Sequence, residues 1–160
     1  MQQTLLVKAM FCSDVLSIKG DRMTEKQYRN PAPTVDAVIY HPIHGLVLIN
    51  RKNPPYGWAL PGGFVEYGER VEEACAREAL EETGLHITLL GLLGVYSDPE
   101  RDPRQHTISI VYCAACNNPQ HITCGDDAGD AQFFPLDSLP EPLAFDHGKI
   151  IKDFMAALDE

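Results

Sequence analysis

Residues 63–85, GFVEYGERVEEACAREALEETGL, carry seven glutamates in a pattern that predicts a helix with a concentrated acidic face. If residues 70–83 are helical, Glu78, Glu81 and Glu82 stand at positions i, i+3 and i+4 and lie within about 100° of one face. Carboxylates held so close repel each other, and a divalent cation is the natural group to offset that repulsion. The segment therefore predicts metal ligands on a helix, with a merely solvated glutamate face as the alternative.

The fixed positions of this segment resemble the Nudix box, the signature of hydrolases that cleave nucleoside diphosphates linked to another group. The matching positions, in chain order, are Gly63, Glu69, Arg77, Glu78, Glu81, Glu82 and Gly84. Ala79 stands where the box usually has Leu, Ile or Val, a departure that concerns packing and not ligands. A solvated helix face would need no glycine or arginine at fixed offsets, so we favour the metal site.

In the Nudix family the last glutamates of the box bind metal. The resemblance implies that Glu78 and Glu82 bind Mg²⁺ or Mn²⁺, which prefer oxygen ligands. It implies Glu81 as a further ligand or as the catalytic base, and the backbone carbonyl of Gly62 as the group that completes the site. Hydrolysis of a diphosphate needs such cations on the phosphate oxygens together with an activated water.

The same resemblance implies that Glu69 and Arg77 pair and hold the loop onto the helix. A direct contact of either residue with metal or substrate is the alternative. We favour the structural role for both.

Outside the box the chain is similar to the ADP-ribose pyrophosphatase branch of the family. The matching stretches are residues 28–36, 58–66, 94–104, 125–128, 134–136 and 144–147, and Pro99 lies near the position of a proline that marks this branch. This similarity implies a metal-dependent enzyme that splits ADP-ribose into AMP and ribose 5-phosphate. The alternatives are hydrolysis of another nucleoside diphosphate derivative or of a nucleoside triphosphate, and a non-catalytic domain that senses ADP-ribose.

Three arginines and an aspartate outside the box are further candidates for the site. Arg51 ends a predicted strand and could clamp a phosphate bidentately, unless it is only a solvated strand end. Arg101 and Arg104 are candidates for binding a second phosphate or a ribose, with local salt bridges as the alternative. Asp127 lies in a loop that often reaches the metals in relatives, so it is a candidate base or outer ligand, with a turn-forming role as the alternative.

Two more residues have a packing interpretation that we favour over a functional one. Trp58 is a candidate for stacking on a base, but a single Trp in a strand is more often part of the core. His147 stands near the start of the last predicted helix, where capping or packing is favoured over contact with substrate.

Length and charge narrow the class of protein. The 160 residues are 44% hydrophobic, which predicts a single domain spanning residues 1–160, although residues 1–27 match nothing recognisable. The formal charge of -10 argues against a nucleic-acid polymer as partner but not against a small phosphorylated substrate, since bound metal reverses the local sign. No apolar run spans a membrane and no clear signal peptide is present, so we expect a cytoplasmic protein, with a homodimer left open.

The five cysteines, an odd number, fit a reduced protein. Cys113, Cys116, His121 and Cys124 have a spacing that would suit a zinc knuckle. Against zinc, the first two lie in a predicted strand at positions that point to opposite faces. We expect ordinary thiols.

Hydrophobic periodicity and turn residues predict the order of the elements. We expect strands at 34–40, 46–51, 58–60, 86–96, 107–116 and 131–135, helices at 70–83 and 146–158, and one helical turn at 136–139. The strand at 86–96 should bend at Gly91 and Gly94. This order predicts an α+β fold with a mixed sheet, and the Nudix resemblance implies an α/β/α sandwich with the sheet between helices.

Overall fold

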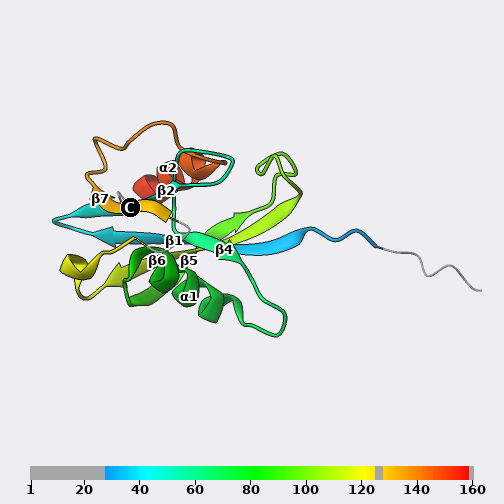
Figure 1. Cartoon of the computed structure of the whole chain (residues 1–160), viewed down its shortest axis with the longest axis horizontal. Helices are drawn as coiled ribbons and strands as arrows, with labels where there is room; N and C mark the ends of the chain where they lie inside the picture. The colour runs from blue at the N-terminus through cyan, green and yellow to red at the C-terminus, as the bar shows by residue number, and fades with distance from the viewer. Residues whose placement is uncertain (1–27, 125–127, 159–160) are drawn as a thin grey trace, which may run out of the picture.

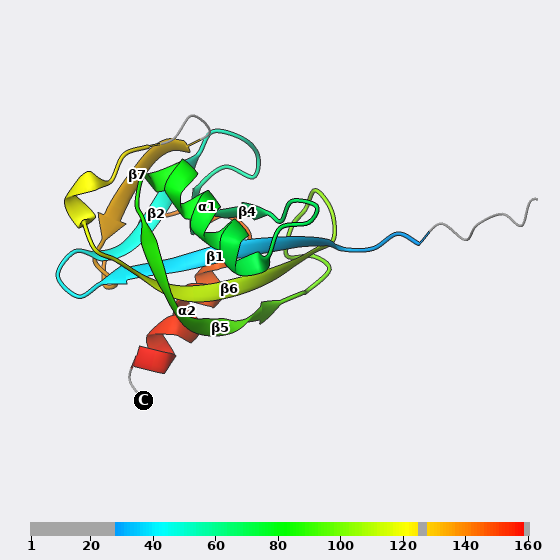
Figure 2. The ribbon, with the colours of Figure 1, turned by 90° about the horizontal axis from the view of Figure 1, so that it is seen from below.

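The structure, a computed structural model, describes residues 28–124 and 128–158. A seven-stranded mixed sheet lies between two helices, with α1 on one face and α2 on the other (Figures 1 and 2). The strands are β1 (Ala32–His41), β2 (Gly45–Arg51), β3 (Trp58–Ala59), β4 (Gly62–Phe64), β5 (Ile87–Tyr96), β6 (Thr107–Cys116) and β7 (Ala128–Phe134). The helices are α1 (Val71–Thr83), α2 (His147–Leu158) and the short 3-10 helix η1 (Pro119–His121). The predicted sandwich with a mixed sheet is confirmed.

The strand order β3-β2-β1-β6-β5 makes β1 the central strand. β1 pairs parallel with β6 and antiparallel with β2, and β4 adds to β1 through a register that sets Asp36 opposite Gly62. β7 pairs with β2. The sheet thereby brings the start of the box, at Gly62 and Gly63, against the middle of β1.

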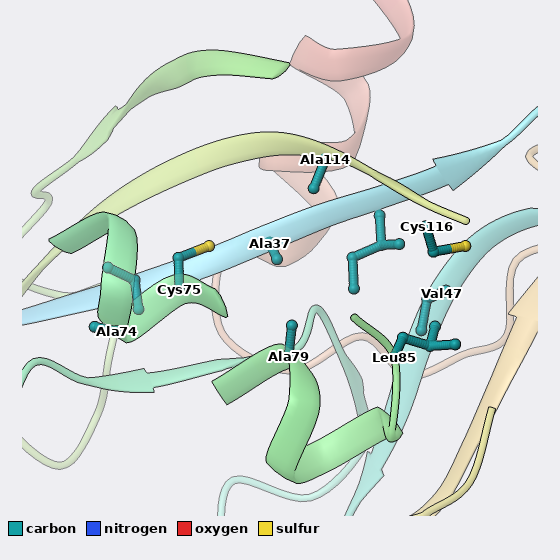
Figure 3. Close-up of a cluster of buried hydrophobic side chains, with 10 residues drawn as sticks. Ala37, Val47, Ala74, Cys75, Ala79, Leu85, Ala114 and Cys116 are labelled. Carbon is teal, nitrogen blue, oxygen red and sulfur yellow. The ribbon is translucent and has the colours of Figure 1, made fainter. Parts of the chain in front are cut away.

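Alternation along β1 builds a hydrophobic core on each face of the sheet. Val35, Ala37 and Ile39 are buried in the cluster under α1, whereas Val38 is buried in the cluster under α2. Figure 3 shows Cys75 and Ala79 of α1 directed toward the sheet around Ala37. Because α1 buries only small side chains, its backbone can lie close to β1, and this brings its glutamates near β4.

Helix α1 ends where the sequence predicts. Gly84 has a left-handed φ of 68° and its N–H donates to the Leu80 carbonyl at 2.8 Å, as at a glycine-capped helix end. Glu72 and Glu73 lie in the first turn, where the helix dipole favours negative charge. The box helix is thus fixed at both ends, with Glu82 in its last turn.

The structure adds detail that the sequence pattern did not provide. β4 is not predicted, because three residues are too few to show alternation, and β7 begins at Ala128, three residues before its predicted start. The predicted helical turn at 136–139 is a hydrogen-bonded turn in which Ser138 N–H donates to the Pro135 carbonyl. The predicted bend in β5 is present as two register shifts, at Leu89/Gly91 and Leu92/Gly94.

Trp58 packs against the cluster under α2, and its ring meets Phe134 edge-on at 4.7 Å between centroids, which matches the favoured core role. Among the described residues, no helix is long and apolar enough to cross a membrane.

Candidate active site

A cavity of about 390 Å³ collects most of the predicted site residues. It lies between α1, β4, the end of β2, the loop before β6 and the start of α2. The predicted residues that line it are Gly62, Glu78, Glu82, Arg51, Arg101, Arg104 and Arg77. Carboxylates and arginines both line it, so the cavity offers oxygen ligands for a cation and guanidinium groups for an anion.

Among the residues that the structure describes, the predicted Glu69 and Glu81 do not line this cavity. The Glu81 side chain is 58% exposed and binds Arg77 Nη1 at 3.1 Å. Asp127 lies outside the described residues. The role of each stays a prediction.

Glu82 is a partly buried carboxylate of the cavity. Its Oε2 accepts a hydrogen bond of 2.9 Å from the Gly62 N–H, which joins the end of α1 to β4. Burial raises the pKa of Glu82 to about 8, although the Gly62 hydrogen bond acts in the opposite direction. Burial likewise raises the pKa of Glu78. Both carboxyls therefore lie where a negative charge is costly without a cation.

Gly63 lets β4 lie against Glu78. A Cβ on Gly63 would collide with the carboxylate of Glu78, and a Cβ on Gly62 would collide with the Val35 carbonyl and the Asp36 carboxylate. Both glycines are therefore required by close approach, and they set a backbone segment directly against two of the predicted metal ligands.

The donor set at this end of the cavity fits a hard divalent cation. It consists of two half-buried carboxylates, Glu78 and Glu82, beside the backbone of Gly62, and every available donor is an oxygen, as Mg²⁺ and Mn²⁺ prefer. In the part of the chain that the structure describes, no three His, Cys, Asp or Glu side chains already converge on one point. A bound cation would offset the charge that burial disfavours.

Arg77 connects the loop after β4 with α1. Its Nε and Nη2 donate to the two carboxylate oxygens of Glu69 at 2.8 and 3.0 Å, and Nη1 donates to Glu78 at 2.8 Å. Nη2 also donates to the Phe64 carbonyl at 3.1 Å. The hydrogen bonds from Arg77 lower the pKa of Glu69 to about 2. Arg77 and Glu69 thus form the pair that the resemblance implies, and Arg77 also orients Glu78.

Arg51 and Arg104 also line the cavity. Arg51 donates from Nε to the Pro55 carbonyl at 2.8 Å and has no salt bridge with any described residue. Burial and, after it, the nearby charge of Arg104 lower the pKa of Arg51. Arg104 binds Asp102 through two hydrogen bonds of 3.0 and 2.8 Å. Arg51 is therefore a half-buried cation that forms no salt bridge within the part of the chain that the structure describes.

Arg101 differs from the other two arginines. It is buried, and its Nε and Nη2 donate to Asp146 at 3.0 and 2.7 Å while Nη1 donates to Thr107 at 3.1 Å. The expected salt bridge within the 97–104 loop is made by Arg104, whereas Arg101 binds an aspartate 45 positions further along the chain. Arg101 forms part of the cavity wall with most of its donors already used.

Asp36 is a site residue that the sequence analysis did not single out. It lines the cavity from β1, is only 7% exposed, and accepts a short hydrogen bond from Ser109 Oγ. Arg101 Nη2 lies 3.6 Å and His147 Nε2 lies 3.5 Å from its carboxylate, and burial raises the pKa of Asp36 to about 7. The available signal was a single charged residue within the apolar run TVDAVIY.

His147 is neutral and holds the start of α2 against the sheet. The Leu60 N–H donates to its Nδ1 at 2.9 Å, so the ring proton is on Nε2, which faces Asp36. Burial lowers the pKa of His147 to about 3. The packing role favoured for His147 agrees with these contacts, although the residue also lines the cavity.

Two of the four candidate zinc ligands, Cys113 and Cys116, lie on opposite faces of the sheet. Cys116 is buried in the cluster under α1, whereas Cys113 packs against the cluster under α2. The two side chains point to opposite faces of β6, as strand alternation predicts.

Comparison with known proteins agrees with this geometry. The model of the NUDIX domain matches residues 30–154, well over half of the chain. The chain belongs to the NUDIX family. The segment that resembles the box, residues 63–85, lies within the matched range.

The NUDIX relatives include proteins of several kinds. The chain is 52% identical to an ADP-ribose pyrophosphatase of Methanocaldococcus jannaschii over 139 residues, which cover 86% of this chain and 80% of that protein. It is 32% identical to an ADPR responsive transcriptional repressor of Acinetobacter baylyi over 143 residues, 84% of this chain and 57% of the repressor. The match to the repressor leaves much of that longer protein uncovered.

Solved structures give the same picture of the fold. The NUDIX domain of Shewanella oneidensis NrtR, solved with ADP ribose, has a TM-score of 0.72 at 30% identity and covers 82% of this chain and 90% of that chain. A bifunctional NMN adenylyltransferase/ADP ribose pyrophosphatase from Francisella tularensis, solved with AMP and a Mn ion, has a TM-score of 0.71 at 29% identity, covering 81% of this chain and 42% of that chain.

Proposed function

We propose that this NUDIX chain is a metal-dependent hydrolase that converts ADP-ribose and water into AMP and ribose 5-phosphate. The observation that carries the proposal is the lining of the 390 Å³ cavity, where Glu78 and Glu82 occur together with Arg51 and Arg104. A diphosphate bridge needs cations on its oxygens, and this lining can supply two kinds, a metal ion held by the carboxylates and the arginines themselves. The 52% identity to an ADP-ribose pyrophosphatase supports ADP-ribose as the substrate.

In this proposal Glu78, Glu82 and the Gly62 carbonyl hold Mg²⁺ or Mn²⁺. Such an ion neutralises charge on phosphate oxygens and makes a coordinated water more acidic. Arg77 keeps the Glu78 carboxylate in place through its 2.8 Å hydrogen bond. Glu81 is proposed as a further ligand or as the base that takes the proton from the attacking water, and Asp127 as the second candidate base.

Arg51 is proposed to bind a phosphate. It is half-buried without a carboxylate partner among the described residues, and Arg104 nearby makes its charge still more costly. A phosphate anion would relieve both effects with bidentate geometry. Arg104 is hydrogen-bonded to Asp102 and is proposed to contact the second phosphate or a ribose. Arg101 is proposed to have mainly a structural role in the lining of the cavity.

The test is a comparison of substrates with Mg²⁺ or Mn²⁺ present, read by chromatography of the nucleotide products. We expect AMP from ADP-ribose with a higher kcat/KM than any release of phosphate or pyrophosphate from a nucleoside triphosphate. A higher kcat/KM for a triphosphate would move the assignment to that substrate. ADP-ribose binding without turnover would indicate a sensing domain, but all box glutamates are present, which favours catalysis.

The proposal also includes a cytoplasmic protein that acts on a small nucleotide. Light scattering would measure whether the chain forms a homodimer.

A further inference from the structure

Phe145 has a backbone conformation that an aromatic residue rarely adopts. Its φ is 55°, and among the residues described here no other non-glycine residue has a positive φ. The left-handed region is crowded for side chains with a Cβ, so it persists only where the surroundings determine it, which is often at a functional site.

The chain is held on both sides of Phe145. Before it, Ala144 is buried and its N–H donates to the Trp58 carbonyl at 2.8 Å. After it, Asp146 receives two hydrogen bonds from Arg101, and the His147 ring is fixed by the Leu60 N–H. Because its neighbours are anchored, Phe145 takes up the change of direction between the segment paired with β3 and the start of α2.

This constrained turn places the Phe145 ring in the cavity wall beside two arginines. The Arg51 Cζ lies 4.7 Å and the Arg104 Cζ lies 5.2 Å from the ring centroid. Both distances are within the range of cation–π attraction. The two arginines come from different elements, the end of β2 and the loop before β6, and Phe145 is the aromatic side chain that both contact.

Two guanidinium groups so close together repel each other, and each has one other anchor, the Pro55 carbonyl for Arg51 and Asp102 for Arg104. The aromatic face attracts both cations and offsets part of that repulsion. Without the ring, each arginine would keep only its other anchor against this repulsion, and a substrate would have to complete the ordering as it binds, which weakens affinity.

We infer that Phe145 is a positioning residue that holds Arg51 and Arg104 ready for the anionic groups of the substrate. The inference rests on the proposed function and deepens it, because it assigns a residue outside the box to substrate affinity. It predicts an effect on KM rather than on kcat, since the ring contacts of Phe145 are with the two arginines and His147 and not with a proposed metal ligand.

The test is a set of substitutions at Phe145 combined with one at Arg51. Phe145→Leu and Phe145→Met keep an apolar side chain but remove the aromatic face, and Phe145→Tyr keeps it. We expect both aliphatic variants to raise KM for ADP-ribose about tenfold with kcat within about threefold of wild type, and Phe145→Tyr to restore the wild-type KM. Thermal unfolding of each variant checks that it is folded.

A double-mutant cycle separates positioning from general packing. In an Arg51→Gln background, Phe145→Leu should raise KM much less than it does in the wild type, because its main partner is already gone. Full additivity of the two changes, or an unchanged KM in both aliphatic variants, would overturn the inference.

The two proposals fail in different ways. If the wild type does not hydrolyse ADP-ribose, the proposed function fails. The same four proteins are then compared by calorimetry, which measures the dissociation constant of inorganic pyrophosphate for each. If the wild type hydrolyses ADP-ribose but the cycle is additive, only the role of Phe145 is wrong.

Discussion

Arg77 binds Glu69 through two parallel hydrogen bonds, from Nε to Oε1 at 2.8 Å and from Nη2 to Oε2 at 3.0 Å. The same guanidinium donates to Glu78 and Glu81. One arginine therefore links the loop after β4 to the acidic face of α1 and offsets the repulsion among three carboxylates.

The first prediction concerns this link. Arg77→Lys keeps the charge but cannot reproduce the paired geometry, so we expect a loss of about 1–2 kcal/mol in the free energy of unfolding. For a domain of this size the melting temperature should fall by roughly 2–8 °C. The matched control is Arg70→Lys on the same helix, where Arg70 is highly exposed and lies 3.9 Å from Glu72. Equal shifts in the two variants would contradict the structural role of Arg77.

Gly62 and Gly63 should respond differently to the same substitution. A Cβ at Gly62 would strike the Val35 backbone, which cannot move aside, so Gly62→Ala should destabilise the fold by about 1–3 kcal/mol. A Cβ at Gly63 would strike only the end of the flexible Glu78 side chain. Gly63→Ala should therefore change stability little but lower turnover by roughly 10–100-fold, because it displaces Glu78, a proposed metal ligand.

Chemical denaturation and steady-state kinetics measure these two effects. The roles assigned to the two glycines of β4 are wrong if Gly63→Ala unfolds the protein while Gly62→Ala leaves it folded.

The pH dependence of stability should report His147. Burial lowers the folded pKa of His147 from 6.5 to about 3, so between these values the unfolded chain binds a proton that the folded chain does not. The histidine therefore destabilises the fold as the pH falls below 6.5, with a slope of at most about 1.4 kcal/mol per pH unit. Asp36 acts in the opposite sense between about pH 4 and 7, because burial raises its folded pKa to about 7.

The effect of His147 is separated from that of Asp36 by the difference in the free energy of unfolding between the wild type and a variant at position 147. The stability advantage of wild type over His147→Gln should grow as the pH rises from about 4 to 6.5 and then level off. His86→Gln, at an exposed position, serves as the control and should keep the wild-type slope. Denaturant titrations across this range would contradict the assignment if the advantage were constant with pH.

The cysteines should bind no stoichiometric zinc. Cys113 and Cys116 lie in core clusters on opposite faces of β6, so they cannot reach one ion without rearranging the strand. Elemental analysis of protein purified without added metal should show this. One zinc per chain that disappears in Cys113→Ser would prove the prediction wrong.

Local signals explain why much of the fold was predictable. The predicted helix at 70–83 and the observed α1 differ by one residue, because Gly84 is a strong stop signal and the glutamate spacing is regular. The bend in β5 follows from Gly91 and Gly94. β4 was missed because its pairing depends on β1, from which it is separated by two intervening strands along the chain.

The candidate site was predictable where the motif is local and not where it depends on distant contacts. Glu78 and Glu82 line the cavity as expected, because residues four apart share a helix face. The Arg101–Asp146 pair joins residues 45 positions apart, and no sequence spacing indicates such a pair. The left-handed conformation of Phe145 has the same origin, since only the buried bridge before it and the anchored residues after it determine that φ.

The measurement that tests the central claim most directly is the turnover of ADP-ribose by Glu82→Gln and Glu72→Gln. Glutamine keeps the shape of Glu82 and an oxygen that can accept the Gly62 hydrogen bond, but it removes the charge that would hold the metal. We expect Glu82→Gln to lose at least ~10²-fold in turnover, the effect of removing a main electrostatic stabiliser, with stability unchanged or higher because burial disfavours that charge.

Glu72 lies in the first turn of the same helix, exposed and close to the Tyr112 hydroxyl. Glu72→Gln should retain wild-type turnover and stability. If the two variants lose turnover equally, α1 is only a charged helix and the assignment of the metal site is wrong.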